Sequence, residues 1–197
     1  MKALVATRNA GKVRELARLL DGAGFELVAL DPEAPEVVED GDTFEANALK
    51  KAREMAAFSG LPTFADDSGI EADALDLRPG IHSARYGGVH GDDEANNELL
   101  LRELEATPDD QRTGRFVCAL AFVDPARGFE HVVRGTIEGS ILRERRGEGG
   151  FGYDPLFLPH GHTRTTAEMS AAEKNAISHR ADAAKRMLTV LRERYLT

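Results

Sequence analysis

Apolar positions along the first third of the chain follow two different periods, which predict strands and helices in alternation. Residues 2–7 and 25–30 are short apolar runs, as expected for buried strands. Between them, Val13, Leu16 and Leu20 recur at helical spacing, and two glycines close that segment. The N-terminal region therefore predicts a strand–helix–strand unit.

A second helix is predicted from Thr43, a good N-cap, to about Ser59, with Gly60 as its stop signal. Thr43, Asn47 and Lys51 are four residues apart and so share one polar stripe of this helix. An apolar face, which includes Phe44 and Met55, lies next to the stripe and predicts burial on one side.

The later part of the chain predicts more strands and two further helical regions. Pro62–Ala65 is expected to be a strand that ends in a turn, and 115–124 and 130–142 are expected to form an antiparallel hairpin. Residues 92–105 predict a helix, and a capping box at Ser170 opens a C-terminal helical region. The prediction is one α/β domain over 1–197 with a long mixed sheet and flanking helices.

Composition narrows the possible partners and locations. The 197 residues carry a net charge of −9, so a polyanionic nucleic acid is a poor general partner. No apolar run approaches the roughly 18 residues that a membrane span needs, and the start does not resemble a signal peptide. A cytoplasmic protein is expected, with Cys118, the single cysteine, as a buried structural thiol.

The turn Thr7-Arg8-Asn9-Ala10-Gly11-Lys12 is the first candidate site. A strand leads into a glycine turn where a helix begins, and such a helix N-terminus binds phosphate through its N–H groups and dipole. The turn is not a P-loop, since the first glycine and the hydroxyl residue after the lysine are absent. An ordinary strand–helix turn is the alternative.

The pair Asp66-Asp67 is the second candidate site. Adjacent carboxylates repel each other unless a cation relieves them, and Mg²⁺ prefers such oxygen ligands. Glu39 or Asp40, in the acidic loop (residues 31–41) before the second helix, is a candidate for a further ligand. The alternative is a solvated turn, because Asp, Ser and Gly are common turn residues.

Two later segments carry the remaining candidates. Gly149–Pro155 places Phe151 and Tyr153 among glycines, which allows close backbone approach to a ligand beside a ring face. In 173–180, Lys174 and Ser178 are expected on one helical face with His179 and Arg180 beside them, suited to an anion or a base edge. A flexible loop tip and an ordinary charged surface helix are the alternatives.

Taken together, these segments resemble the inosine/xanthosine triphosphate pyrophosphatase family. The resemblance covers nearly the whole chain in the right order, and six fragments carry it: T-x-N-x-G-K from Thr7, E-x-G-x-T-F-x-x-N-A-x-x-K-A from Glu39, A-D-D-S-G from Ala65, P-G-I-x-S-A-R-Y from Pro79, G-G-F-G-Y-D-P from Gly149 and S-H-R from Ser178. Each fragment is modestly specific, and six in sequence are hard to obtain otherwise.

The resemblance implies a homodimer with two lobes around a substrate cleft, and Mg²⁺-dependent cleavage of ITP, dITP and XTP between the α and β phosphates. It implies Glu39 and Asp67 as metal ligands and Asp67 also as the general base. Substrate contacts are implied at Thr7, Arg8, Asn9, Ala10, Gly11, Lys12, Ser68, Phe151, Gly152, Tyr153, Asp154, Lys174, His179 and Arg180, and Lys51 is expected to contact the substrate as well. Arg8 departs from the small or amide residue that relatives often have, so its own role is open.

Base selectivity has a physical interpretation as well. Arg180 and protonated His179 are hydrogen-bond donors, which suit the 6-keto oxygen of hypoxanthine or xanthine and not the 6-amino group of adenine. Two rival functions are a nucleotide-binding regulatory module and a phosphoryl-transferring kinase. The carboxylate pair argues against the first, and the missing P-loop residues argue against the second.

Overall fold

The computed structural model describes residues 1–196, and these form one mixed sheet with flanking helices. The strands are β1 (Lys2–Val5), β2 (Glu26–Ala29), β3 (Thr63–Ala72), β4 (Thr113–Asp124), β5 (Phe129–Ile141) and β6 (Phe157–Pro159). The α-helices are α1 (Ala10–Leu19), α2 (Phe44–Ser59), α3 (Asp93–Glu103), α4 (Ala171–Ile177) and α5 (His179–Arg194). Strand order is β2-β1-β3-β4-β5-β6, with β1 parallel to β2 and β3 and with β5 antiparallel to β6. The predicted α/β class with a mixed sheet is confirmed.

The chain divides into two compact units, and each is described by itself. Unit 1 comprises residues 1–67, 118–135 and the C-terminal stretch that starts at His179, and unit 2 comprises residues 68–117 and 136–178. No helix in the described part of the chain is long and apolar enough to cross a membrane.

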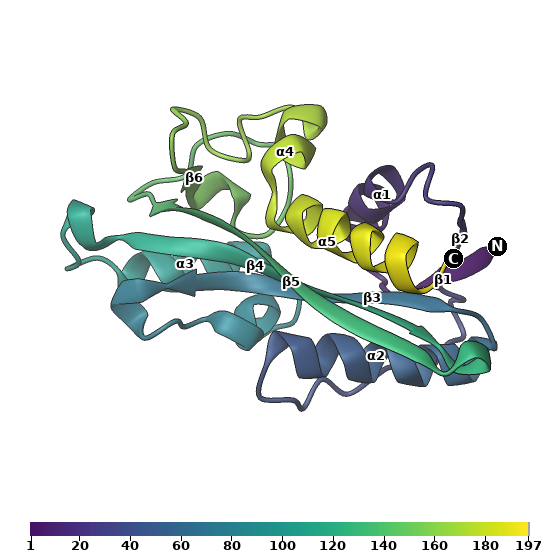
Figure 1. Cartoon of the computed structure of the whole chain (residues 1–197). Coiled ribbons are helices and arrows are strands. Elements are labelled where there is room, and N and C mark those ends of the chain that lie inside the picture. The colour runs from purple at the N-terminus through teal and green to yellow at the C-terminus, as the bar shows by residue number, and fades with distance from the viewer. Residues whose placement is uncertain (197) are drawn as a thin grey trace. The chain divides into compact units, whose positions relative to one another are not determined.

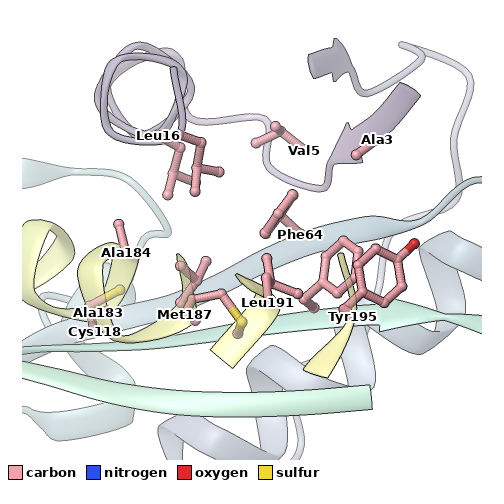
Figure 2. Packing of buried hydrophobic residues seen from close by; sticks show 13 residues of the cluster. Ala3, Val5, Leu16, Phe64, Cys118, Ala183, Ala184, Met187, Leu191 and Tyr195 are labelled. Carbon is pink, nitrogen blue, oxygen red and sulfur yellow. The ribbon is translucent and has the colours of Figure 1, made fainter. Parts of the chain in front are cut away.

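Unit 1 has helices on both faces of its strands. Figure 1 shows α1 and α5 on one face and α2 on the other. Figure 2 shows the core under α1 and α5, where Leu16, Phe64, Met187 and Leu191 converge. The ring of Tyr195 also packs in this core, and its hydroxyl donates to the Asp124 carboxylate at 2.6 Å. Burial of this apolar face is what holds the two helices on the sheet.

The signals at the ends of α2 are confirmed. The Thr43 hydroxyl accepts a hydrogen bond from the Ala46 N–H at 3.1 Å. Gly60 follows the helix at a φ of 69°, a left-handed conformation that glycine adopts without steric cost. These local devices fix the start and end of the helix that carries Asn47 and Lys51.

Unit 2 contains α3, α4 and β6 with its own apolar cluster. Ile70, Leu100 and Leu156 are fully buried there, and the rings of Phe116 and Phe157 have centroids 4.4 Å apart. The capping box predicted at Ser170 is present at the start of α4. This cluster supports the loop that precedes β6, which carries the predicted aromatic contacts.

Two sequence predictions about local structure are wrong. β3 does not end before the acidic pair but continues to Ala72, because Ile70 and Ala72 extend the buried apolar face beyond it. The C-terminal region is two helices and not one, because Ser178 is extended, with a ψ of 157°. Ser178 therefore does not share a helical face with Lys174.

Candidate active site

The turn before α1 is built around the side chain of Asn9. Its Oδ1 accepts from the N–H groups of Gly11 at 2.9 Å and Lys12 at 3.1 Å, and the Asn9 N–H donates to the Thr7 hydroxyl at 3.2 Å. Arg8, Asn9 and Ala10 are exposed. The turn thus places an accessible helix N-terminus, the positive end of the helix dipole, beside Lys12.

Arg8 lies in this turn but its guanidinium is directed elsewhere. It donates to the backbone carbonyl of Ala34 and, at 3.4 Å, to that of Pro32. Both carbonyls belong to the acidic loop that carries Glu39. The structure therefore connects Arg8 to this loop, and a direct phosphate contact by Arg8 stays a prediction.

Asp66 is fully buried and surrounded by cationic groups. Its carboxylate pairs with Lys12 Nζ at 3.1 Å and with Arg180 Nη2 at 3.2 Å, and Lys51 Nζ donates to its backbone carbonyl at 3.0 Å. Burial opposes its ionisation, but Lys12, Arg180 and Lys51 outweigh burial and hold the pKa of Asp66 below its usual range. Asp66 is therefore ionised at neutral pH and binds the site's cations.

Arg180 is held by a second carboxylate that the sequence analysis did not select. Arg180 is 1% exposed, and its guanidinium pairs with both Asp66 and Glu15 of α1. Glu15 lies three residues after Lys12, so the two share one helical face. The spacing of Glu15 from Lys12 was the sequence signal for Glu15. That spacing does not identify its partner, Arg180, which is 165 residues away in sequence.

Asp67 has surroundings unlike those of its neighbour. It is 6% exposed, and Asn47 Nδ2 donates to its carboxylate at 3.1 Å. Burial, together with the negative charge of Glu39, raises the pKa of Asp67 despite Lys12, Lys51 and the Asn47 hydrogen bond. Among the predicted residues, Asp67 is thus the carboxylate best suited to take up a proton.

Asn47 also ties the acidic loop to Asp67, a role that the sequence analysis missed. Its Oδ1 accepts from the Gly41 N–H at 2.8 Å, while its Nδ2 donates to Asp67. A Cβ on Gly41 would lie 2.8 Å from that Oδ1, so glycine is required for this approach. Within the same loop, Glu39 forms an ion pair with Lys51.

The carboxylates of Glu39 and Asp67 fit a magnesium ion. Glu39 is close enough to raise the pKa of Asp67, a repulsion that a cation between them would relieve. No group of three His, Cys, Asp or Glu residues within 1–196 is arranged to hold a metal. Two carboxylates match the usual protein share of a Mg²⁺ shell that water and phosphate complete.

Within unit 2, several of the predicted contacts lie around Asp154. Its carboxylate accepts from Lys174 Nζ at 2.6 Å, from the Phe151 N–H at 2.9 Å and from the Thr166 hydroxyl at 2.8 Å. Lys174 Nζ lies 4.7 Å from the centroid of the Phe151 ring. The Tyr153 hydroxyl is buried and donates to the Ser83 carbonyl at 2.8 Å. Asp154 and Tyr153 thus hold this loop in shape.

Two further predicted contacts, Ser68 and His179, lie in different units. Ser68 is a partly exposed residue within β3 and belongs to unit 2, whereas His179 is a buried residue at the start of α5 in unit 1. Their roles toward a substrate stay predictions.

Cys118 is buried in β4, as predicted, and its surroundings suppress its reactivity. Burial raises the pKa of the thiol to about 12, so almost no thiolate is present at neutral pH. We expect no reaction of the folded chain with a disulfide reagent such as DTNB at pH 8, and one equivalent after unfolding in guanidinium. Rapid reaction in the folded state would contradict this burial.

An α/β sheet that brings lysines and carboxylates together at a helix N-terminus is typical of proteins that handle phosphate groups. The chain belongs to the Ham1 family, whose sequence model matches residues 3–190. A dITP/XTP pyrophosphatase of Desulforamulus reducens is 49% identical over 100% of this chain and 98% of that protein, and one of Nocardia farcinica is 53% identical over 96% and 94%. A HAM1 protein of Coxiella burnetii has a similar structure, with a TM-score of 0.88, 39% identity, and coverage of 98% of this chain and 99% of that one.

Proposed function

We propose that this chain is a nucleoside triphosphate pyrophosphatase that hydrolyses ITP, dITP and XTP to the monophosphate and pyrophosphate. Its relatives of about 50% identity over nearly the full chain carry the name dITP/XTP pyrophosphatase. The observation that carries the proposal is Asp67, a buried carboxylate with a raised pKa beside Lys12, Lys51 and Glu39. Such a reaction removes deaminated purines from the nucleotide pool.

The chain's own groups suit attack of water at the α phosphorus. Asp67 accepts a proton from the water, the new bond forms to the α phosphorus, and the bond to the α–β bridging oxygen breaks. The electron pair leaves with pyrophosphate, whose charge Lys12 and Lys51 would stabilise. In the structure these lysines pair with Asp66 and Glu39, so the triphosphate would share their donors with both carboxylates.

We further propose that the activity depends on Mg²⁺, held by Glu39 and Asp67. When bound, the ion neutralises phosphate charge at the site. Titration with Mg²⁺ by calorimetry, in the presence of a non-hydrolysable ITP analogue, tests the site without turnover. We expect Glu39→Gln to weaken binding of the ion about tenfold or more, and unchanged binding would exclude Glu39 as a ligand.

Selectivity for the base is part of the same proposal. Arg180 already pairs with Asp66 and Glu15, so its reading of a 6-keto oxygen stays a prediction, as does that of His179. An unsatisfied buried donor costs about 1–3 kcal/mol, so ATP should be cleaved at least about tenfold less efficiently than ITP. Equal kcat/KM for both nucleotides would contradict base recognition through donors.

Product analysis after incubation with ITP and Mg²⁺, with ATP and GTP in parallel, tests the proposed reaction. Inosine monophosphate and pyrophosphate in equal amounts are expected. Release of single phosphates would indicate a phosphatase or transferase, and no turnover would favour a nucleotide-binding module. The homodimer and the cytoplasmic location stay predictions, and light scattering in solution tests the first of them.

A further inference from the structure

Helix α3, which neither the sequence motifs nor the proposed mechanism uses, contacts Gly152 in the loop Gly149–Pro155, which carries Phe151 and Tyr153. The Gly152 N–H donates to Asp93 Oδ2 at 2.7 Å, and the Gly152 carbonyl accepts from Asn97 Nδ2 at 2.9 Å. Asp93 and Asn97 are four residues apart, so they lie on one face of α3. One helix face therefore engages both backbone polar groups of a single loop residue.

The orientation of the Asn97 amide follows from its partners. Nδ2 donates to the Asp93 carbonyl at 2.6 Å as well as to the Gly152 carbonyl. Both partners are acceptors, so the opposite orientation would place Oδ1 against two carbonyl oxygens. Asn97 is 4% exposed, so water cannot readily replace a lost donor.

Gly152 separates the two residues that carry the loop's rings. Its φ of +63° belongs to the left-handed region, so the chain changes direction there between Phe151 and Tyr153. Phe151 is only partly buried, and Lys174 lies against its ring. The position of the Gly152 backbone therefore decides where the accessible aromatic ring lies.

We propose that Asp93 and Asn97 are positioning residues that set the affinity of the site for the nucleoside half of the substrate, by fixing the loop that presents Phe151 to the base. This inference rests on the proposed function. Helix α3 and the loop both belong to unit 2. Pyrophosphate carries no base, so loosening the loop should weaken binding of the nucleoside without weakening binding of pyrophosphate.

Asn97→Asp is the sharpest test, because it keeps the size of the side chain and replaces the donor with an acceptor. We expect KM for ITP and the inhibition constant of inosine monophosphate to rise about tenfold, as for loss of one buried hydrogen bond. The kcat should stay within about twofold, because binding lost equally in ground and transition states alters KM alone. The inhibition constant of pyrophosphate should not change.

Asp93 supplies a second test that does not disturb a buried residue. Asp93→Ala removes the acceptor for the Gly152 N–H and should raise the same two constants severalfold, whereas Asp93→Asn keeps an acceptor oxygen and should restore them. Glu98→Gln is the matched control, since Glu98 is exposed on the same helix and contacts Arg145. It should behave as the unmodified protein.

The outcomes separate this inference from the proposed function. Absence of ITP hydrolysis by the unmodified protein would remove the basis of the inference and overturn the proposed function. If the unmodified protein hydrolyses ITP, unchanged constants for inosine monophosphate in Asn97→Asp and Asp93→Ala would overturn the positioning role alone. An equal rise in the inhibition constant of pyrophosphate would also overturn it, because general loosening of the fold would then be the cause.

Discussion

Replacing Asp67 with asparagine should abolish most of the turnover while making the metal-free protein more stable. The general base of a hydrolysis contributes roughly 10²–10⁴-fold to the rate, and an amide cannot take up the proton. We therefore expect kcat for ITP to fall by that factor at saturating Mg²⁺. Asn47 can still donate to the new amide oxygen, so the local hydrogen bond is retained.

The gain in stability follows from the raised pKa of Asp67. Burial and the charge of Glu39 disfavour its ionised form, so the folded chain binds this proton more tightly than the unfolded chain does. Above both pKa values the ionised group therefore destabilises the fold, and this penalty disappears as the pH falls through the raised folded pKa. The free energy of unfolding of Asp67→Asn should exceed that of the unmodified protein at neutral pH, and the difference should shrink in acid.

Urea unfolding in EDTA between pH 4 and pH 8, together with steady-state kinetics, measures both effects. Glu36→Gln is the matched control, because Glu36 is an exposed carboxylate of the same acidic loop and is not a candidate site residue. It should keep normal turnover. Near-normal kcat in Asp67→Asn would exclude Asp67 as the base, and a loss of stability at pH 7 would contradict a net unfavourable environment for its charge.

Sequence patterns predicted the parts of the fold that local interactions determine. Thr43 and Gly60 delimit α2 through hydrogen bonds and backbone conformations that involve only neighbouring residues. Sequence patterns did not predict the order of the strands, because β1 lies between β2 and β3 through contacts that no short segment encodes. The extension of β3 through the acidic pair was missed for the same reason, since turn-forming residues stay extended there only in their tertiary surroundings.

The sequence also did not reveal that Asp66 and Asp67, although adjacent, have different surroundings and suit different roles. Successive side chains of a strand point to opposite faces, so Asp66 and Asp67 meet different partners. Asp66 meets Lys12 and Arg180, whereas Asp67 meets Asn47. Because Arg180 is 114 residues from Asp66 in sequence, only the folded chain shows which carboxylate stays charged and which can take up a proton.

Replacing Arg180 with methionine should cause a large loss of stability. Removing one partner from a buried ion pair typically costs about 3–5 kcal/mol, because the remaining charge stays buried without compensation. Asp66 is fully buried and Glu15 is largely so, and both pair with this guanidinium. For a chain of this length the melting temperature should fall by roughly 6–20 °C.

The cost of Arg180→Met should depend on pH, because it depends on the charge of Asp66. The pKa of Asp66 in the folded chain is below its unfolded value because Lys12, Arg180 and Lys51 outweigh burial. The stability that this carboxylate contributes is therefore present above about pH 4, its unfolded pKa, and is lost as the pH falls through the folded pKa. Arg180→Met weakens that contribution, so its cost should be largest at neutral pH and should decrease in acid.

Thermal and urea unfolding of a small set of variants separates the buried pair from charge in general. Arg186→Met, on the same helix, breaks only an exposed pair with Asp182 and should cost less than about 0.5 kcal/mol. Adding Asp66→Asn to Arg180→Met removes the uncompensated charge, so the double variant should be more stable than additivity of the single losses allows. Strict additivity would mean that Asp66 and Arg180 do not depend on each other, contrary to the contact between them.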